Sequence, residues 1–431
     1  MTSPLKKLTA LYEEAEPGTT PPVASVAVRD STGIASTTVG GRPGTRFQAA
    51  SISKAVAAAA ALRLVADDVI ALDRDVTTYL RSWRPPSETH VPFTLRQLLS
   101  HSAGLTVHGF PGYAPGLPLP TLPQILDGAD PANTGPVRVA GIPGLTFKYS
   151  GGGYTVVQQL MEDVTGAPFA DLADELVFRP AGMFTATYHP DSDSTAVAHV
   201  DGRPVAGGGH RYPEQAAAGM WCTAEDLIRF VSAIRDAAEG DGELLPTALA
   251  REMLTEQAAP LGLGLFLEPD PVLPRFGHGG DNHGFTCFVT ASRTGPYAVA
   301  VMHNDDTSID MLTRVKDTAM RETGWPHTAE ETTRSRGVRT LDDWRHRYGG
   351  DWRLPDGRNV RIDWPRDGGD DAKAPTITVG DGAALTLTVH GLRHVSVDAV
   401  RTELEFDLDS SGRATTMTIR QFGTESTATR V

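Results

Sequence analysis

The segment Phe47-Gln-Ala-Ala-Ser51-Ile-Ser-Lys54-Ala-Val56 places a serine three residues before a lysine, at the start of an alanine-rich run that continues to about Ala66. Residues at positions i and i+3 of a helix lie on one face, so a helix here would set Ser51 beside Lys54. The N–H groups of a first helical turn have no partner within the helix. The segment therefore predicts a helix start that presents a hydroxyl, an amine and free N–H donors together.

This arrangement suits a nucleophilic serine. The hydroxyl must lose its proton to a nearby base, and lysine can be that base when burial keeps its amine neutral. The partial positive charge of a helix start favours the oxyanion that forms next. The same short pattern also arises by chance, with the serine as an N-cap and the lysine in solvent. Both interpretations stand on this segment alone.

The composition restricts the class of protein. A chain of 431 residues is too long for one ordinary core and predicts two or three domains. A net charge of −14 offers no attraction to nucleic acid or anionic lipid, so we expect neither as a partner. The two cysteines, Cys222 and Cys287, form no metal-ligand cluster or disulfide framework, and we expect two buried thiols, no metal and no cofactor.

The amino terminus lacks the pattern of a secretory signal. Lys6 and Lys7 are not followed by an apolar run of suitable length, and Glu13 and Glu14 interrupt early. No stretch approaches 18 uninterrupted apolar residues, so no transmembrane helix is expected. We therefore expect a cytoplasmic protein.

The first 326 residues alternate helical and strand patterns, which predicts a mixed α/β domain. Residues 106–145 are rich in proline and glycine, as in the long irregular loops that build the rim of a binding site. Thr223 and Asp226 have the spacing of a capping box. We expect helices over residues 5–14, 51–66, 94–104, 154–165, 169–178 and 308–323, and strands over 23–28, 262–267, 284–290 and 297–302, with 36–39 as the hairpin partner of 23–28.

The pattern changes after a polar stretch at 327–340, which we interpret as a linker. Residues 341–431 contain short runs that alternate with period two and are separated by turns rich in glycine and aspartate. This predicts a small β-barrel or sandwich, separate from a catalytic domain at 1–326. The expected strands are 351–354, 360–364, 376–379, 385–389, 403–408 and 416–419.

Two further segments fit a catalytic Ser51. Tyr149 lies in a glycine-rich loop before a helix, where its phenol can pass a proton if a nearby cation such as Lys54 lowers its pKa from about 10. His278 begins the glycine-rich stretch His278-Gly-Gly-Asp-Asn282, where a substrate can approach the main chain closely and the imidazole can donate a proton near neutral pH. The alternatives are a packed tyrosine and a hairpin with a surface histidine. A Ser-His-Asp triad is less favoured, because no G-x-S-x-G motif is present.

In combination, Ser51-x-x-Lys54, Tyr149-Ser-Gly151 and His278-Gly-Gly280 occur in the order used by one family. Over roughly residues 10–325 the sequence resembles the serine β-lactamase and penicillin-binding-protein superfamily, and in particular its class C-like esterase and peptidase branch. The segments Leu98–Leu105, Leu72-Asp73, Val76 and Tyr79-Leu80 also match that branch. The resemblance implies an α/β (α+β) fold, in which helices flank an antiparallel sheet beside an all-helical subdomain.

The resemblance also implies roles. Ser51 would be acylated, Lys54 would be its base, Tyr149 would relay protons, and His278 would replace the lysine or histidine of the family's third motif. The N–H groups of Ser51 and Asp281 would form the oxyanion hole. The neighbouring substrate-binding residues would be Gly151, Gly279, Gly280 and Asn282.

One departure concerns the second motif, where Gly151 replaces the family's usual asparagine. That amide usually binds the acyl-side amide of a peptide or β-lactam, so its absence favours esters or small amides bound differently. The carboxy-terminal strands, with Arg345–Trp352 as the opening segment, are similar to the lipocalin-like barrel of some D-amino-acid-specific peptidases and peptide cyclases.

The sequence leaves three functions open. The first is a metal-free serine hydrolase acting on a small-molecule or peptide ester or amide. The second is an acyltransferase or peptide cyclase, in which an amine replaces water. The third is a catalytically inactive binding protein of the same fold. The substrate and the oligomeric state are not predicted.

Overall fold

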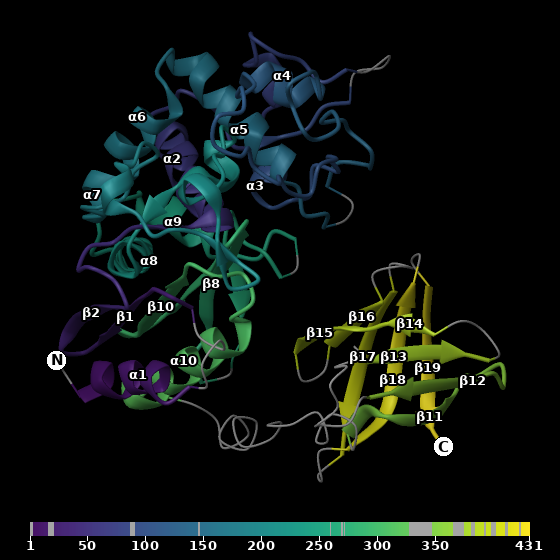
Figure 1. Cartoon of the computed structure of the whole chain (residues 1–431). Helices are drawn as coiled ribbons and strands as arrows, with labels where there is room; N and C mark the ends of the chain where they lie inside the picture. The colour runs from purple at the N-terminus through teal and green to yellow at the C-terminus, as the bar shows by residue number, and fades with distance from the viewer. Residues whose placement is uncertain are drawn as a thin grey trace. The chain divides into compact units, whose positions relative to one another are not determined.

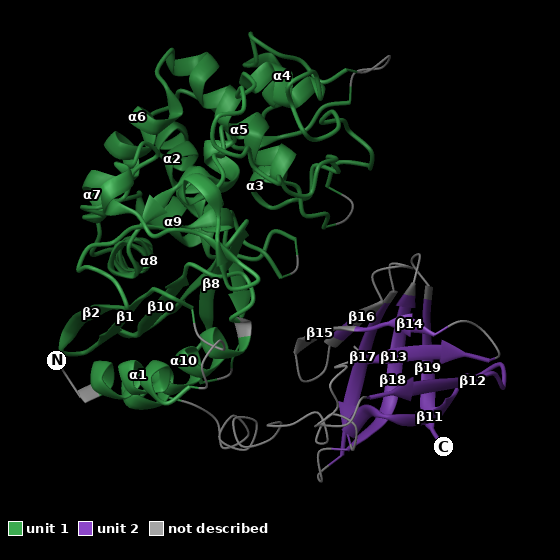
Figure 2. Cartoon of the chain, viewed as in Figure 1, with its two compact units in different colours: residues 1–326 green, residues 327–431 purple. Residues whose placement is uncertain are grey.

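The chain divides into two compact units, residues 1–326 and 327–431, which are described separately (Figure 2). The buried apolar residues of the first unit run from Leu5 to Trp325, and those of the second run from Tyr348 to Ala428, so each unit has its own core. The expected linker at 327–340 lies outside the described residues. The computed structural model describes residues 3–15, 21–86, 91–144, 147–258, 260–268, 270, 272–326, 347–364, 375–380, 384–391, 394–397, 402–409, 413–421 and 424–431.

The first unit is built on an antiparallel sheet with the strand order β2-β1-β10-β9-β8-β7 among the described residues (Figure 1). The predicted pairing of residues 23–28 with 36–39 is confirmed by the β1–β2 hairpin. The central strands are buried along their whole length because helices cover both faces. The strands are β1 (Ala24–Asp30), β2 (Gly33–Val39), β7 (Phe266–Glu268), β8 (Arg275–Asn282), β9 (Phe285–Ser292) and β10 (Ala298–His303).

Two helices from opposite ends of the unit cover one face of this sheet. Helices α1 (Ser3–Glu13) and α10 (Ile309–Glu322) pack on each other and enclose a core that includes Leu8, Val299 and Val315. On the other face, α8 (Ala224–Glu239) contacts β1, β9 and β10. Its start carries the predicted capping box, in which Thr223 Oγ1 accepts the N–H of Asp226 at 3.3 Å.

A helical region stands beside the sheet, as expected (Figure 1). Its centre is α2 (Ser53–Ala66), whose alanines from Ala55 to Ala61 are fully buried, because small side chains let neighbouring segments approach closely. Of the helices that the structure describes, none combines the length and apolar character needed to cross a membrane. The other helices are α3 (Leu95–Leu99), α4 (Leu122–Asp127), α5 (Gly151–Thr165), α6 (Phe169–Ala173), α7 (Arg179–Ala181) and α9 (Thr247–Met253), and two short ribbons pair β3 (Phe47–Gln48) with β6 (Trp221–Cys222) and β4 (His199–Val200) with β5 (Arg203–Pro204).

Four local predictions in the first unit need correction. The first is the helix expected at 94–104, since α3 already ends at Leu99. Ser51 lies in a 3₁₀ turn, η1 (Ala50–Ile52), and α2 begins only at Ser53. Of the strand expected at 262–267, only Phe266 and Leu267 belong to β7. The glycine-rich stretch at 275–282 is itself strand β8, although glycine weakens strands. The reason is close packing, because a Cβ at Gly277 would lie 2.1 Å from the Val289 carbonyl oxygen.

The second unit is one curled antiparallel sheet with the order β14-β13-β12-β11-β19-β18-β17-β16-β15 among the described residues. Its two outer strands, β14 and β15, are separated in the chain only by the buried Leu387. The two edges of the sheet must therefore approach each other, which curls the sheet into a half-barrel. Tyr348, Trp352 and Phe406 pack inside it. The strands are β11 (Gly350–Arg353), β12 (Asn359–Asp363), β13 (Thr376–Val379), β14 (Leu385–Thr386), β15 (Thr388–Gly391), β16 (His394–Val397), β17 (Thr402–Leu408), β18 (Ala414–Gln421) and β19 (Thr424–Arg430).

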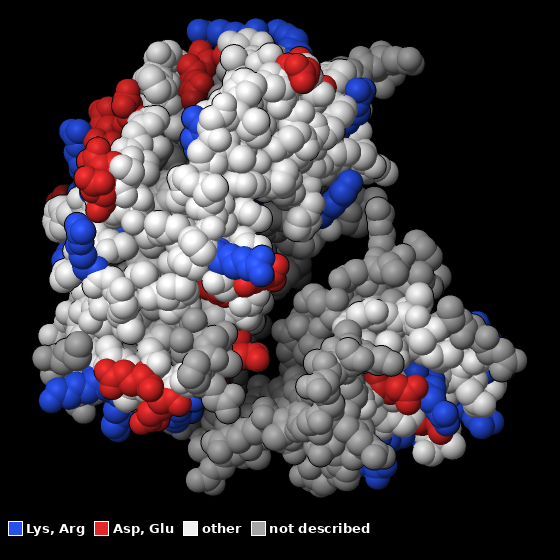
Figure 3. All heavy atoms as spheres, in the orientation of Figure 1, with Lys and Arg blue, Asp and Glu red and all other residues white. Residues whose placement is uncertain are grey.

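Charged side chains are unevenly distributed on the first unit. On the face of the first unit seen in Figure 3, acidic and basic side chains lie mainly at the margins, around a broad area without charge. The described residues on this face therefore form no extended basic patch.

Candidate active site

Ser51 and Lys54 lie side by side, as the sequence predicts, although they belong to consecutive helical turns of different type. The Lys54 Nζ atom is 3.0 Å from Ser51 Oγ and donates to the carbonyl oxygen of Ala217 at 2.8 Å. Ala217 belongs to the turn η6 (Gln215–Gly219), which packs against α2 and η1. No sequence pattern indicates this carbonyl, because it is an atom of the main chain brought in by tertiary packing.

Lys54 has the environment that a lysine base requires. Its side chain is buried, and this burial lowers the pKa of the amine to about 7. No described carboxylate pairs with it: its polar contacts are Ser51 Oγ and the Ala217 carbonyl, and the rings of Tyr149 and Tyr154 lie 5.1 and 5.9 Å from Nζ. A substantial share of the amine is therefore neutral at neutral pH and can accept the proton of the Ser51 hydroxyl.

Tyr149 reaches the same hydroxyl from the loop before α5. Its phenol hydrogen-bonds to the Ser51 side chain, but burial raises the pKa of Tyr149 to about 12, the Ser51 contact lowers it only in part, and the nearby Asp281 carboxylate raises it. The expectation that Lys54 lowers this pKa below 10 is wrong, because burial disfavours the phenolate more than the Ser51 contact favours it. Tyr149 is thus a proton donor in the resting protein.

His278 completes the group, since its ring centroid lies 6.3 Å from that of Tyr149. Its Nδ1 atom is 2.5 Å from the Gly279 carbonyl oxygen, so Nδ1 carries the proton and Nε2 is left as an acceptor. Nε2 is buried and has no hydrogen-bond partner in the structure. Burial, with the Lys54 charge, lowers the pKa of His278 to about 4, so the expectation that it donates a proton near neutral pH is wrong.

The main chain of β8 presents N–H groups at an edge that has no strand partner among the described residues. A two-residue turn joins β8 to β9, and the residues on either side of it, Asn282 and Phe285, form a hydrogen-bonded pair. Such pairs occur at every second residue of an antiparallel strand, so the next ones on β8 are Gly280 and His278. The N–H groups of Gly279 and Asp281 then point away from β9. On that side β7 pairs only as far as Gly277, which leaves the edge of β8 open among the described residues. An oxyanion can lie there, between Asp281 N–H and the Ser51 turn.

Gly280 and Gly279 fit this edge for different reasons. A Cβ at Gly280 would lie 2.6 Å from the Ala49 carbonyl oxygen and 3.0 Å from Ala50 Cβ, so only glycine lets β8 approach the Ser51 turn. A Cβ at Gly279 would meet only the Cys287 carbonyl oxygen at 3.8 Å, which leaves room for a substrate above it.

Asn282 corrects the expectation that its side chain binds substrate. Its Nδ2 atom donates to Gln48 Oε1 at 2.7 Å and to the Ala218 carbonyl oxygen at 3.1 Å, and the residue is buried. Both amide hydrogens are therefore used inside the protein. The side chain joins β8 to β3 and to η6.

The space that a side chain at position 151 would need is occupied by the preceding loop. Gly151 is the first residue of α5, and its N–H donates to the His108 carbonyl oxygen at 2.8 Å. A Cβ there would lie 3.0 Å from this oxygen and 3.0 Å from the Phe110 ring. The loop at 108–110 thus occupies the direction in which a longer side chain would leave the main chain.

His101 is a site residue to which sequence reasoning gave no role. Its ring lies on that of Tyr149, with centroids 4.1 Å apart and planes inclined by 33°, and the ring of His108 lies 5.0 Å from Tyr149 on the exposed loop. Burial lowers the pKa of His101 well below its usual value, and the Lys54 charge adds to this. The available signal was the family-like segment Leu98–Leu105, which contains His101 but gives no indication of the stacking.

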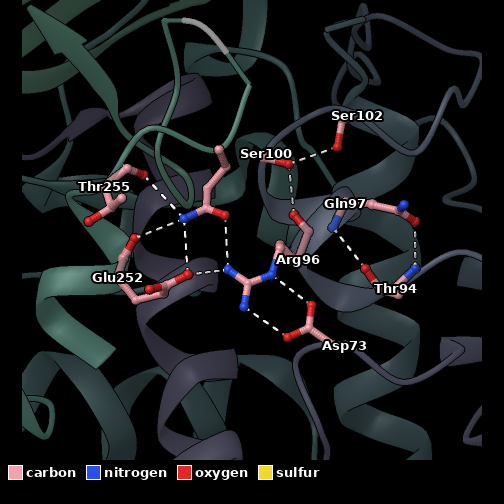
Figure 4. A network of polar contacts seen from close by, with 9 residues as sticks. Asp73, Thr94, Arg96, Gln97, Ser100, Ser102, Glu252 and Thr255 are labelled. Atoms are coloured by element: carbon pink, nitrogen blue, oxygen red, sulfur yellow. Dashed lines mark hydrogen bonds and ion pairs between the residues drawn. The ribbon is translucent and has the colours of Figure 1, made fainter. Parts of the chain in front are cut away.

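A polar network anchors the short helix α3 that precedes His101 (Figure 4). The Arg96 guanidinium binds both carboxylate oxygens of Asp73, at 2.6 and 2.8 Å, and also contacts Glu252 and Gln257. Thr94 and Gln97 cap the helix reciprocally. These contacts tie α3 to the loop after α2 and to the end of α9, so the segment that leads to the site has a fixed course.

Comparison with known proteins agrees with this geometry. The family model for beta-lactamase matches residues 15–323. The chain belongs to the beta-lactamase family. The superfamily resemblance drawn from the sequence motifs is thereby confirmed. Of the side chains that the structure describes, no three histidine, cysteine, aspartate or glutamate residues gather as a metal ligand set.

Individual relatives of this beta-lactamase family protein cover only part of it. Esterase EstB of Burkholderia gladioli is 30% identical over 259 residues, which are 50% of this chain and 63% of that protein. A D-aminopeptidase of Brucella anthropi is 30% identical over 152 residues, 34% of this chain and 29% of that protein. The chain thus spans less than two thirds of either relative. The octameric penicillin-binding protein homologue from Pyrococcus abyssi has the same fold, with a TM-score of 0.61, 17% identity, and coverage of 98% of this chain and 99% of that chain.

Proposed function

We propose that this protein is a serine hydrolase that cleaves an ester or amide through an acyl-Ser51 intermediate. The observation that carries the proposal is the buried Lys54 amine, 3.0 Å from Ser51 Oγ and with a pKa lowered to about 7. An esterase and a D-aminopeptidase among the partial relatives support the reaction class. The Ser51-x-x-Lys54 pattern alone could not separate this from a solvated lysine, whereas the burial of Lys54 favours the catalytic interpretation.

Acylation begins when the neutral Lys54 amine accepts the Ser51 proton and Oγ attacks the substrate carbonyl carbon. The carbonyl π bond breaks, and its oxygen takes the negative charge between the N–H groups of Ser51 and Asp281. When the tetrahedral intermediate collapses, Tyr149 donates its phenolic proton to the leaving alcohol or amine, and the Lys54 ammonium restores that proton. The products are acyl-Ser51 and the protonated leaving group.

Deacylation runs the same path in reverse with a new nucleophile. Water gives a proton to the Tyr149–Lys54 pair, attacks the acyl carbon and releases the acid, after which Ser51 Oγ regains its proton. His278 remains neutral, and its free Nε2 can accept a hydrogen bond from Tyr149, from substrate or from water.

The filled space at Gly151 favours small acyl groups. No side-chain amide stands at the second motif to bind the acyl-side amide of a peptide or β-lactam, and the His108–Phe110 loop occupies its direction. We therefore expect efficient turnover of short-chain esters and poor turnover of cephalosporins.

The test is Ser51→Ala, with Ser31→Ala in the exposed β1–β2 turn as the matched control. Ser51→Ala should abolish fluorophosphonate labelling and lower ester turnover by at least about 10³-fold, while the thermal melt is unchanged. Ser31→Ala should behave as wild type. Similar turnover by Ser51→Ala and wild type would refute the proposal, and an unlabelled wild type would favour a binding protein.

The acyl acceptor needs a separate measurement, because an amine can replace water without any change in the groups described. Products of a short acyl ester should be analysed with and without an added primary amine. The acid alone indicates a hydrolase. An amide that forms in proportion to the amine, and only with intact Ser51, indicates an acyltransferase.

A further inference from the structure

The charge at the mouth of the site points to the substrate class. We propose that Asp281 is a specificity-determining residue, whose carboxylate favours substrates with a positive charge near the scissile bond and excludes those with a carboxylate there. This inference rests on the proposed function and concerns its substrate.

The main chain and the side chain of Asp281 have separate roles in this proposal. Its main-chain N–H lies on the open edge of β8, and its side chain is exposed beside that edge. The carboxylate is held in place, because Thr286, its cross-strand neighbour, donates its hydroxyl to Asp281 Oδ1 at 2.6 Å. A carboxylate so fixed cannot move away from a bound substrate without losing this hydrogen bond.

The carboxylate is close enough to act on the reacting groups. Burial raises the pKa of Tyr149, whose phenol bonds to Ser51, and that of Cys287 behind the β8 edge, and the charge of Asp281 adds to both shifts. A substrate whose carbonyl carbon meets Ser51 Oγ therefore lies within the field of Asp281.

No permanent cation balances this charge among the described site residues. Lys54, whose pKa burial lowers to about 7, is only partly charged near pH 7 and already contacts Ser51 and Ala217, and burial keeps His278 and His101 neutral. The charged side chains that shift the pKa values of Tyr149, His101, His108 and His278 are Lys54, Asp281 and the histidines themselves.

A carboxylate near the scissile bond would thus meet a negative field and no cationic partner. An ammonium group would gain Coulomb energy at the same place. Esters or amides that carry an amine are the favoured class, neutral ones are intermediate, and substrates with a terminal carboxylate are disfavoured.

The experiment uses three phenyl acetates that differ only at the meta position: trimethylammonium, the neutral isostere tert-butyl, and carboxylate. For each, kcat/KM is measured for wild type and Asp281→Asn. Because asparagine keeps the shape and an oxygen acceptor for Thr286, the variant removes the charge alone. Intrinsic ester reactivity cancels when the ammonium-to-carboxylate ratio of kcat/KM is compared between proteins.

The matched control is Asp67→Asn, which makes the same change in net charge. Asp67 is exposed at the far end of α2, whose 14 residues span about 20 Å from the site, well beyond the screening length of salt. The ammonium-to-carboxylate ratio should fall roughly tenfold in Asp281→Asn and stay near the wild-type value in Asp67→Asn. Added salt should reduce the ratio in wild type and Asp67→Asn but much less in Asp281→Asn.

An unchanged ratio in Asp281→Asn, or an equal fall in both variants, would overturn this inference while tert-butyl ester turnover upholds the proposed function. If wild type neither turns over the tert-butyl ester nor reacts with fluorophosphonate, the proposed function fails and this inference with it.

Discussion

The Nδ1 atom of His101 accepts the main-chain N–H of Ser150 at 3.1 Å. The carbonyl oxygen of His101 also accepts the N–H of Lys148 at 2.7 Å, and its ring lies on Tyr149 between them. His101 thus hydrogen-bonds to the main chain on both sides of Tyr149 and packs against the face of the tyrosine ring. Because Nδ1 is the acceptor, this contact requires a neutral imidazole, which burial favours. His101 is therefore placed to fix the Tyr149 phenol on Ser51.

We expect His101→Leu to lower kcat for a short-chain ester by at least about tenfold with little change in KM, because a misplaced proton donor weakens the reaction more than binding. His101→Asn is the matched variant: asparagine tolerates the left-handed main chain at this position (φ 54°) and supplies an acceptor. It should recover part of kcat. Loss of thermal stability with kcat unchanged in the folded protein would reduce His101 to a packing residue.

The pH dependence of acylation should report Lys54. Ser51 needs the neutral amine, so fluorophosphonate labelling and kcat/KM should rise with pH and level off above the lowered pKa of about 7. Tyr149, with its pKa raised to about 12, and His278, with its pKa lowered to about 4, add no step between pH 5 and 9. Rates measured over that range should give one ascending limb. A flat profile, or a fall from pH 6 to 8, would contradict a lysine base.

The same shift links Lys54 to stability. Between the folded pKa near 7 and the ordinary value of 10.5, the unfolded chain holds a proton that the folded protein does not. Raising the pH through this window therefore stabilises the native state, and lowering it destabilises that state. Denaturant unfolding of wild type and Lys54→Met measures this effect. From pH 7 to 10 the free energy of unfolding of wild type should increase relative to that of the variant. A constant difference between them would show that Lys54 titrates normally.

Gly151→Asn should fail to create a β-lactamase. The new Cβ would meet the His108 carbonyl oxygen and the Phe110 ring, each at 3.0 Å, so we expect a loss of about 1–3 kcal/mol in stability and no gain in cephalosporin turnover. Gly166→Asn is the control in the same helix, since Gly166 has φ 75° and open space around it. Thermal melts and a chromogenic cephalosporin measure both effects. Robust cephalosporin hydrolysis by Gly151→Asn would show that the loop yields easily.

Local sequence patterns predicted the elements that depend on local chemistry. The capping pair Thr223 and Asp226, the β1–β2 hairpin and the proximity of Ser51 and Lys54 all follow from spacing over a few residues. The patterns failed where distant packing decides. Strand β8 contains glycines because β9 and the Ser51 turn come close, and no local rule contains that information.

The same limit applies to protonation in the site. The sequence suggested an acidic Tyr149 and a proton-donating His278, but these residues are buried, and burial raises the pKa of the first and lowers that of the second. His101 was missed for a related reason: its contact with Tyr149 joins residues that are 48 positions apart in the chain and depends on how α3 is anchored.

The second unit should be dispensable for the chemical step. Among the residues that the structure describes, every member of the first unit's buried clusters lies at or before Trp325, and every member of the second unit's cluster lies at or after Tyr348. Ser51, Lys54, Tyr149 and His278 all belong to the first unit. A chain that ends at Pro326 should therefore melt cooperatively, react with fluorophosphonate and turn over small activated esters nearly as the full chain does. For a bulky preferred substrate we expect a raised KM with kcat retained, since lost binding contacts leave the reacting groups unchanged. A soluble fragment with full-length kinetics on every substrate would exclude the second unit from substrate binding, and a fragment that unfolds would show that the first core needs it.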